Sequence, residues 1–328
     1  MFTTSMLIVG VPGRTATLFA EELKKAANVL GVGRRELVEN IKKGNVFVSK
    51  GSNIFRFDID IISKKEIHTQ KDIDYLFITT KNPVSSVIKE YLPEFEEKIP
   101  NIVLSQNGFK AAEEAKEAID EIFGSTKNSY QIIRLALFNS VREVKDGETS
   151  IIEYKTPIRV AFSVFYGTNE TDALEDILKN SGIEYTKVPR DDLKNMEYSK
   201  LFTNLIGIPS YSLGFNIEDG LRNKDAFKEE MLALKEYVAV VKKSGGHFLN
   251  LPHYPIATFA SLVEHIPLSV LLFFRPTVTK LVLSLRHTKE KGNIDEIDYY
   301  TGAIIDLGRR YRVEMPINER VLRRIKNG

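Results

Sequence analysis

The stretch Met6-Leu-Ile-Val-Gly-Val-Pro-Gly-Arg-Thr-Ala16 decides the fold of the first half of the chain. It begins with a short apolar run that ends in a glycine, and residues 14–27 then repeat apolar side chains at helical spacing. A buried strand, a tight turn and an amphipathic helix, in this order, open a dinucleotide-binding unit. The sequence therefore predicts an α/β fold for this half of the chain.

The turn inside this stretch departs from the usual dinucleotide-binding pattern, G-x-G-x-x-G. Pro12 stands where the second glycine is expected, and Thr15 stands where the third is expected. Proline has no N–H and carries a ring, which hinders the close approach of a phosphate at that point. A shifted pattern, Gly10-x-x-Gly13-x-x-Ala16, keeps two glycines and a small residue. Two interpretations stay open: a cofactor-binding loop built on Gly10 and Gly13, or an ordinary strand-to-helix turn.

The end of the second strand, near residues 29–32, bears on the choice of cofactor. An acidic residue after this strand would normally bind the ribose 2′-hydroxyl of the dinucleotide. The chain has Gly33-Arg34-Arg35 instead. Because guanidinium groups suit a 2′-phosphate, a bound cofactor is predicted to be NADPH rather than NADH. The alternative is that these arginines form the solvated start of a helix.

Two further strand ends carry candidate ligand-binding residues. Residues 74–79 have the pattern of a buried strand and lead to Lys81, and residues 101–104 form the next strand, followed by Gln106-Asn107-Gly108. In an open parallel sheet, ligands bind beyond the carboxyl ends of the strands. Lys81 and Asn107 are therefore candidate site residues, although Asn-Gly is also a common turn pair.

The rest of the chain changes from alternating strands and helices to helices alone. Three strands are predicted at 132–138, 149–154 and 159–164, followed by a helix at 171–180 and a last strand at 183–188. From residue 198 on, the periodic segments are helical, including 227–244, 256–264 and 268–280. We therefore predict a dinucleotide-binding domain over residues 1–190 and an all-α domain over residues 191–328.

The composition argues against several classes of function. The chain has 328 residues, no cysteine, 43% apolar and 27% charged residues, and a net charge of +2. It therefore has no disulfides and no thiolate nucleophiles or metal ligands, and its histidines lack metal-ligand spacing. Since the charge is small and no apolar run is long enough to span a bilayer, we expect neither nucleic-acid binding nor membrane insertion. We expect a cytoplasmic protein without a metal ion.

The most informative stretch of the second half is Tyr198-Ser-Lys-Leu-Phe-Thr-Asn204. If it is helical, Lys200 and Asn204 lie one turn apart on the same face. Residues 205–209 are apolar or small, so this face points inward or into a cleft. Lys200 is then either a solvated residue at the rim or a proton donor held at the edge of a pocket.

A second informative block runs from Ser284 to Asp298. Glu296 follows Asn293 by three residues, which fits a capping arrangement at the start of a helix. Capping does not exclude a second task, because a carboxylate at a helix N-terminus is held rigidly and kept ionised. Both interpretations of Glu296 stay open.

Together, these motifs resemble those of the ketopantoate reductase family. The resemblance runs through nearly the whole chain in order: the glycine turn, Lys81, Gln106-Asn107-Gly108, Tyr198-x-Lys200-x-x-x-Asn204, Ser284 and Gly292-x-x-x-Glu296-Ile297-Asp298. Its most specific element is the twelve-residue step from Ser284 to Glu296. The resemblance implies a Rossmann-like domain followed by an all-helical domain like that at the C-terminus of 6-phosphogluconate dehydrogenase.

The resemblance also implies a reaction and the residues that carry it. Members of this family reduce 2-dehydropantoate to pantoate with NADPH, on the route to pantothenate and coenzyme A. By analogy, Lys200 would be the general acid and Glu296 a carboxylate of the substrate site. Asn107, Asn204 and Ser284 would hold the substrate. The cofactor would be held by Gly10, Gly13, Arg34, Lys81 and Asn107, with Arg34 at its 2′-phosphate. A homodimer would also be compatible with the family.

Two departures from the family pattern leave alternatives. One is Pro12 in the glycine turn. The other lies one turn after Asn204, where the family often has a second asparagine and this chain has Ile208-Pro209. The substrate then loses one hydrogen bond or is less polar at this point. The alternatives are a reductase for another 2-oxo acid or an imine, and a family member that has lost catalysis and binds a metabolite or a partner.

Overall fold

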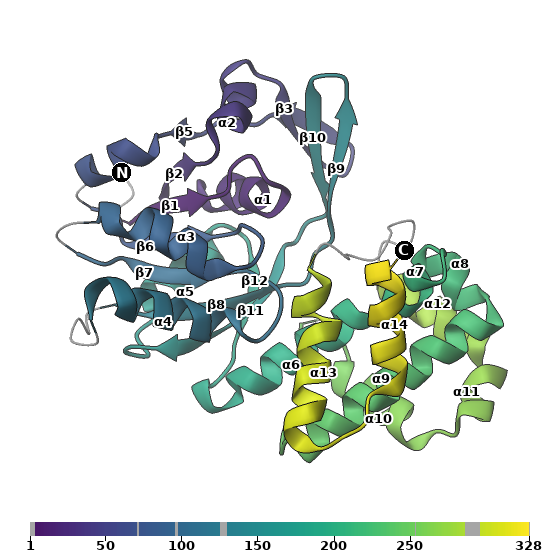
Figure 1. Ribbon diagram of the computed structural model, residues 1–328. Coiled ribbons are helices and arrows are strands. Elements are labelled where there is room, and N and C mark those ends of the chain that lie inside the picture. The colour runs from purple at the N-terminus through teal and green to yellow at the C-terminus, as the bar shows by residue number, and fades with distance from the viewer. Residues whose placement is uncertain are drawn as a thin grey trace. The chain divides into compact units, whose positions relative to one another are not determined.

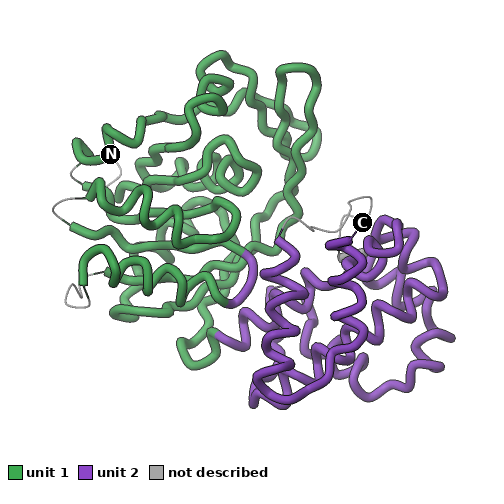
Figure 2. Tube along the Cα trace, in the orientation of Figure 1, with its two compact units in different colours: residues 1–106, 110–193 green, residues 107–109, 194–328 purple. Residues whose placement is uncertain are grey.

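The computed structural model describes residues 4–70, 72–95, 98–124, 130–252, 254–285 and 296–327. The chain divides into two compact units (Figure 2). Unit 1 comprises residues 1–106 and 110–193, and unit 2 comprises residues 107–109 and 194–328. The short segment Asn107–Phe109 therefore belongs to unit 2, although it lies between two elements of unit 1 in the sequence.

Unit 1 is built on a mainly parallel sheet (Figure 1). Its strand order is β12-β11-β8-β7-β6-β1-β2-β5. The strands are β1 (Ser5–Val9), β2 (Asn28–Val32), β5 (Asp60–Ile61), β6 (Tyr75–Ile78), β7 (Asn101–Leu104), β8 (Ile132–Leu137), β11 (Arg159–Tyr166) and β12 (Glu184–Lys187). Strand β11 is antiparallel to β8 and parallel to β12, whereas the other neighbours pair in parallel.

Helices cover both faces of this sheet, because the central strands bury side chains on both sides. Met6 and Ile8 of β1 belong to one apolar cluster, and Leu7 and Val9 belong to the other. The first cluster includes side chains of α1 (Arg14–Leu23) and α5 (Asp172–Asn180). The second includes side chains of α3 (Val84–Tyr91) and α4 (Ala111–Phe123). The remaining helices of unit 1 are α2 (Arg35–Lys42), η1 (Lys64–Thr69), η2 (Leu92–Glu94) and η3 (Arg190–Asp192).

A second, smaller sheet has the strand order β4-β3-β10-β9 and packs against α1. Its strands are β3 (Val46–Lys50), β4 (Asn53–Arg56), β9 (Val141–Asp146) and β10 (Thr149–Tyr154). Of these, only β10 was predicted from the sequence. Strand β9 shows no alternation because nearly all of its residues are exposed, which leaves no periodic pattern to recognise.

A buried ionic cluster joins the smaller sheet to α1. The Tyr154 hydroxyl donates to Glu22 Oε1 at 2.7 Å, and Lys50 Nζ lies 2.8 Å from the same oxygen. Burial alone would raise the pKa of Glu22, but the hydrogen bonds from Lys25, Lys50 and Tyr154 together hold this pKa below its ordinary value. Burial, with the nearby Glu22 charge, raises the pKa of Tyr154. The tyrosine is therefore the neutral donor of the cluster.

Unit 2 is helical and is arranged around one long central helix. Its helices are α6 (Leu193–Leu205), α7 (Ile208–Ser212), α8 (Ile217–Arg222), α9 (Lys224–Lys243), α10 (Ile256–His265), α11 (Leu268–Phe273), α12 (Arg275–Leu285), η4 (Ile297–Tyr299), α13 (Thr301–Tyr311) and α14 (Pro316–Asn327). Helix α9 contacts α7, α8, α10, α11, α13 and α14. The predicted fold class, a Rossmann-like unit followed by a helical unit, is confirmed.

Two helical predictions differ from the structure. The predicted helix 268–280 consists of α11 and α12, since Pro276 near the start of α12 supplies no N–H to continue the preceding helix. The helix that the capping arrangement of Asn293 and Glu296 predicts begins only at Thr301, after the short 3₁₀ helix η4. Among the described residues, no helix has both the length and the apolar character that crossing a membrane requires.

We predict that Tyr154→Phe lowers the free energy of unfolding at pH 7 by about 1–3 kcal/mol, because a buried carboxylate loses a hydrogen bond. Since the folded-state pKa of Glu22 is lowered, this stabilisation is present above the unfolded-state pKa and is lost as the pH falls through the folded-state value. The difference in unfolding free energy between the variant and the parent should therefore become smaller below about pH 4. Urea unfolding from pH 3 to 7 measures it.

Tyr185→Phe is the matched control, because its hydroxyl bonds to the more exposed Glu175 at 3.3 Å. We expect this variant to change the unfolding free energy by less than about 0.5 kcal/mol. Equal losses in the two variants, or a loss for Tyr154→Phe that is constant with pH, would contradict the role assigned to the cluster.

Candidate functional site

The glycine turn after β1 folds back on its own backbone. Gly13 N donates to Gly10 O at 2.7 Å, and Gly10 N donates to Val32 O of β2 at 2.9 Å. The peptide bond between Val11 and Pro12 is cis. Gly10 has a φ of +108°, and a Cβ on Gly13 would lie 2.7 Å from Gly10 O. This turn therefore needs glycine at both positions of the shifted pattern Gly10-x-x-Gly13.

A third glycine, which the sequence analysis did not single out, closes the same turn. A Cβ on Gly33 would lie 1.9 Å from Val11 O, so no side chain fits there. Gly33 follows β2, which pairs with β1, and this pairing brings the two strand ends together. The sequence signal that could have revealed it is a glycine directly after the second strand, next to the predicted turn.

The start of α1 offers hydrogen-bond donors for an anion. Gly13 caps the helix without a side-chain bond, the first turn carries no acidic residue, and Gly13 and Arg14 are exposed. The first N–H groups of a helix lack acceptors within the helix, and its dipole favours negative charge there. Pro12 precedes the helix, so its missing N–H removes none of these donors. The N-terminus of α1 therefore fits the diphosphate of a dinucleotide.

Four of the five predicted cofactor residues, all but Asn107, follow neighbouring parallel strands of the sheet. Strands β6, β1 and β2 are neighbours, and their carboxyl ends lead to Lys81, to the glycine turn and to Arg34, respectively. Arg34 caps α2, and both Arg34 and Arg35 are exposed. Lys81 is exposed as well. The donor set is cationic and glycine-rich, which suits a ligand that carries phosphate groups.

In unit 2, a hydrogen bond joins two of the predicted substrate residues. Asn204 Nδ2 of α6 donates to Asn107 Oδ1 at 3.0 Å. Lys200 lies one turn earlier on α6 and is half-buried. Phe109 packs edge-on against Tyr198 of the same helix, with ring centroids 5.8 Å apart. The segment 107–109 is therefore attached to the helix that carries Lys200.

The same segment also meets the chain just after Glu296. Gly108 has a φ of +91°, and a Cβ there would lie 2.9 Å from Tyr299 O. Glu296 is only 8% exposed, and the Tyr300 hydroxyl donates to its Oε2 at 3.5 Å. The structure thus brings α6, residues 107–109 and residues 296–300 to one place in unit 2. Contact between Lys200 and Glu296 stays a prediction.

Two sequence predictions in this region involve residues whose side chains are not described. Asn293, the proposed partner of Glu296 in a capping arrangement, lies outside the described residues. Glu296 itself precedes η4 and makes no side-chain capping bond to it. Ser284 lies in α12, but its side chain is outside the described part of the chain. Its role at the substrate site stays a prediction.

A buried glutamate that the sequence analysis missed fixes the end of α6. Glu230 of α9 is fully buried and accepts hydrogen bonds from Gly207 N at 3.1 Å, Ser210 N at 2.9 Å and Ser210 Oγ at 2.7 Å. Gly207, with a φ of +96°, makes the turn from α6 to α7. A carboxylate three residues after Phe227 and four before Leu234, on the apolar stripe of α9, was the available signal.

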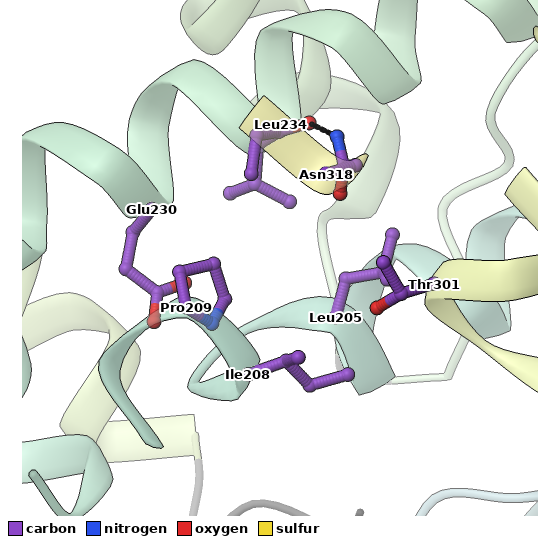
Figure 3. A pocket seen from close by; sticks show the side chains of 8 residues that line it. Leu205, Ile208, Pro209, Glu230, Leu234, Thr301 and Asn318 are labelled. Atoms are coloured by element: carbon purple, nitrogen blue, oxygen red, sulfur yellow. Dashed lines mark hydrogen bonds between the residues drawn. The ribbon is translucent and has the colours of Figure 1, made fainter. Parts of the chain in front are cut away.

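Ile208 lines a narrow gap next to Glu230 (Figure 3). It is lined by Leu205, Ile208, Pro209, Glu230, Ala233, Leu234, Thr301 and Asn318 and is too narrow to hold a water molecule. Ile208 is 1% exposed and contributes to this apolar packing. The position at which the family often has asparagine is therefore a core position here.

The fold and these residues define a Rossmann-like α/β protein with an all-helical second unit. A family model described as "Ketopantoate reductase PanE/ApbA" matches residues 6–150, and its C-terminal counterpart, "Ketopantoate reductase PanE/ApbA C terminal", matches residues 192–327. The chain belongs to the ketopantoate reductase family.

Individual relatives agree with this assignment. The chain is 27% identical over 217 residues to the 2-dehydropantoate 2-reductase of Saccharomyces cerevisiae, a match that covers 63% of this chain and 52% of that protein. The chain thus spans about half the length of this curated relative. In fold it is similar to a PanE/ApbA family ketopantoate reductase from Ralstonia eutropha, with a TM-score of 0.72, 14% identity and coverage of 98% of this chain and 97% of that one.

A second solved structure with a similar fold is a ternary complex of D-mandelate dehydrogenase with NADH and anilino(oxo)acetate. Its TM-score is 0.70 at 19% identity, and the alignment covers 99% of this chain and 97% of that one. At this level of identity, both structural likenesses show the fold alone.

We predict that Glu230→Gln lowers the free energy of unfolding by about 2–4 kcal/mol, because the buried turn at Gly207 loses a charged acceptor and meets an amide N–H instead. Urea unfolding at pH 7 is the measurement. Glu39→Gln, which removes the exposed i,i+3 ion pair with Lys42 in α2, is the control and should cost less than about 0.5 kcal/mol. A Glu230→Gln variant as stable as the parent would show that the carboxylate of Glu230 is not needed to hold the turn at Gly207.

Proposed function

We propose that the protein is an NADPH-dependent 2-oxo acid reductase and that 2-dehydropantoate is its substrate. Besides membership of the family, the observation that carries this proposal is the hydrogen bond between Asn204 and Asn107. It places two neutral polar groups beside the helix face of Lys200, as the recognition and protonation of a 2-oxo acid require.

In the proposed mechanism, each residue of unit 2 has a separate task. When bound, the nicotinamide supplies a hydride to the ketone carbon, which places negative charge on the oxygen. The Lys200 ammonium stabilises this charge and donates the proton that completes the hydroxyl group. Asn107, Asn204 and Ser284 orient the substrate through hydrogen bonds. Glu296, a carboxylate of the same site, interacts with the Lys200 ammonium.

In unit 1, the exposed start of α1 would hold the diphosphate of NADPH, with Gly10 and Gly13 shaping the loop. Arg34 would pair with the 2′-phosphate, and Lys81 would complete the cofactor residues of this unit. Asn107, which belongs to unit 2, is the fifth residue to which the family resemblance gives a cofactor role. No metal ion takes part in this proposal.

The wider setting is proposed from the family. The protein would act in the cytoplasm, on the route to pantothenate and coenzyme A, and would form a homodimer. Its dinucleotide-binding domain would comprise residues 1–190, and its substrate domain residues 191–328. Neither a nucleic acid nor a membrane would be a partner.

A second candidate function is reduction of another 2-oxo acid. The burial of Ile208 favours it, because this position then supplies no hydrogen bond to a polar substrate. NADPH oxidation measured with a panel of 2-oxo acids separates the two candidates: the highest kcat/KM should be for 2-dehydropantoate under the first proposal, and for a 2-oxo acid with a less polar side chain under the second.

We predict that Lys200→Ala lowers kcat by about 10²–10⁴-fold, since the reaction loses its positioned acid. Steady-state NADPH oxidation measures the effect. Lys194→Ala, which removes an exposed lysine from the same helix, is the control and should retain kcat within about twofold. A Lys200→Ala variant as active as the parent would remove Lys200 from the mechanism.

We predict that Arg34→Ala weakens NADPH binding by about 10–100-fold and leaves NADH binding unchanged, because only NADPH carries the 2′-phosphate. Calorimetric titration of the two cofactors gives the dissociation constants. Lys43→Ala controls for the loss of one exposed positive charge at the other end of α2. Equal weakening of both cofactors by Arg34→Ala would refute the assignment to the 2′-phosphate.

A further inference from the structure

Two buried polar atoms lie at the carboxyl ends of β6 and β7. They are Thr80 Oγ1 and Gln106 Oε1, and within the described part of the chain neither has a hydrogen-bond partner. Gln106 as a whole is only 5% exposed. Because a buried polar atom without a partner is costly and rare, each such atom needs an explanation.

Neighbouring polar groups at the same strand ends are satisfied by the backbone. The Thr79 hydroxyl donates to Val9 O at 2.7 Å, and the Ser105 hydroxyl donates to Ile78 O at 3.1 Å. The amide nitrogen of Gln106 also donates to Ile78 O, at 3.2 Å, which places its side chain against the end of β6. Folding therefore accounts for the hydroxyls of Thr79 and Ser105 and for the amide nitrogen of Gln106, but it gives Thr80 Oγ1 and Gln106 Oε1 no partner among the described residues.

The location of Thr80 relates it to the dinucleotide site. A Cβ on Gly10 would lie only 3.1 Å from Thr80 Cγ2, so Thr80 borders the glycine turn. The neighbouring strands follow the order β2-β1-β6-β7. Since Arg34 follows β2 and the glycine turn follows β1, a dinucleotide with its 2′-phosphate at Arg34 and its diphosphate at the turn extends its nicotinamide half toward the end of β6.

We propose that the Thr80 hydroxyl donates a hydrogen bond to an oxygen of the nicotinamide half of the cofactor, in its ribose or its adjacent phosphate. The Gln106 carbonyl accepts one from a hydroxyl or amide N–H of the same half. A hydroxyl is a donor and an amide oxygen an acceptor, so the two atoms are complementary to a sugar. This inference rests on the proposed function for the presence of NADPH, and it concerns a side chain next to Lys81 to which the family resemblance gave no role.

The test is calorimetric titration of the protein without substrate, using NADPH and 2′,5′-ADP, which carries only the adenosine half. Thr80→Val keeps the shape of the side chain and removes the hydroxyl. We expect it to weaken NADPH binding about tenfold, equivalent to about 1.4 kcal/mol, and to leave 2′,5′-ADP binding unchanged. Thr80→Ser, which keeps the donor, should bind NADPH like the parent.

Ser163→Ala is the control, because it removes a buried hydroxyl of β11 that the backbone already engages: it donates to Pro189 O at 3.3 Å. It should lower thermal stability but change NADPH affinity less than about threefold. Equal NADPH affinities of the parent and Thr80→Val, or equal losses in Thr80→Val and Ser163→Ala, would overturn the inference. If Thr80→Val weakens NADPH binding as expected while the parent reduces no 2-oxo acid, the inference stands and the proposed function fails.

Discussion

The burial of β1 on both faces is the constraint on which the rest of unit 1 depends. Its central side chains pack alternately into two apolar clusters, and residues 6–9 are at most 1% exposed. A strand in this position has no solvent-facing side, so a ligand can approach it only beyond its end. There the chain turns so tightly that three glycines are required: backbone oxygens occupy the places of side chains at Gly13 and Gly33, and Gly10 has a φ of +108°. The candidate cofactor loop is thus a direct consequence of core packing.

Unit 2 is subject to a different constraint. Its short helices leave many backbone groups at their ends without partners inside the helix. Carboxylates of α9 satisfy several of them. Glu230 accepts from the turn at Gly207, and Glu236 accepts from Ile317 N at 2.8 Å and Asn318 N at 3.0 Å at the start of α14. Each acid binds at a helix N-terminus, where the dipole favours its charge. The central helix therefore positions α6, and with it Lys200, through ionic hydrogen bonds as well as apolar contacts.

The sequence predicted elements with a clear period and missed those without one. The strand, turn and helix around Gly10 were predicted because apolar runs and glycines mark them, and α9, α10 and the segment of α11 and α12 were predicted from their apolar residues at helical spacing. Strand β9 was not predicted because nearly all of its residues are exposed. The break between α11 and α12 was not predicted because the sequence is apolar on both sides of it. A local pattern could mark Gly33 and Glu230 as unusual, but it could not give their partners, because Val11 and Gly207 lie in distant segments of the chain.

Asn107 received two roles from the family resemblance, in cofactor and in substrate binding, and its surroundings bear on both. The compact units divide the chain between Gln106 and Asn107. Gln106 is anchored to β6 and β8 through Ile78 O and the Arg134 guanidinium, which donates to Gln106 O at 2.9 Å. Asn107 is anchored to α6 by Asn204. Because its amide oxygen accepts a hydrogen bond from Asn204, which we propose for the substrate site, the proposed substrate role of Asn107 has a physical basis in unit 2. The polar side chain that follows β7 and still belongs to unit 1 is Gln106, whose amide we propose as a cofactor contact.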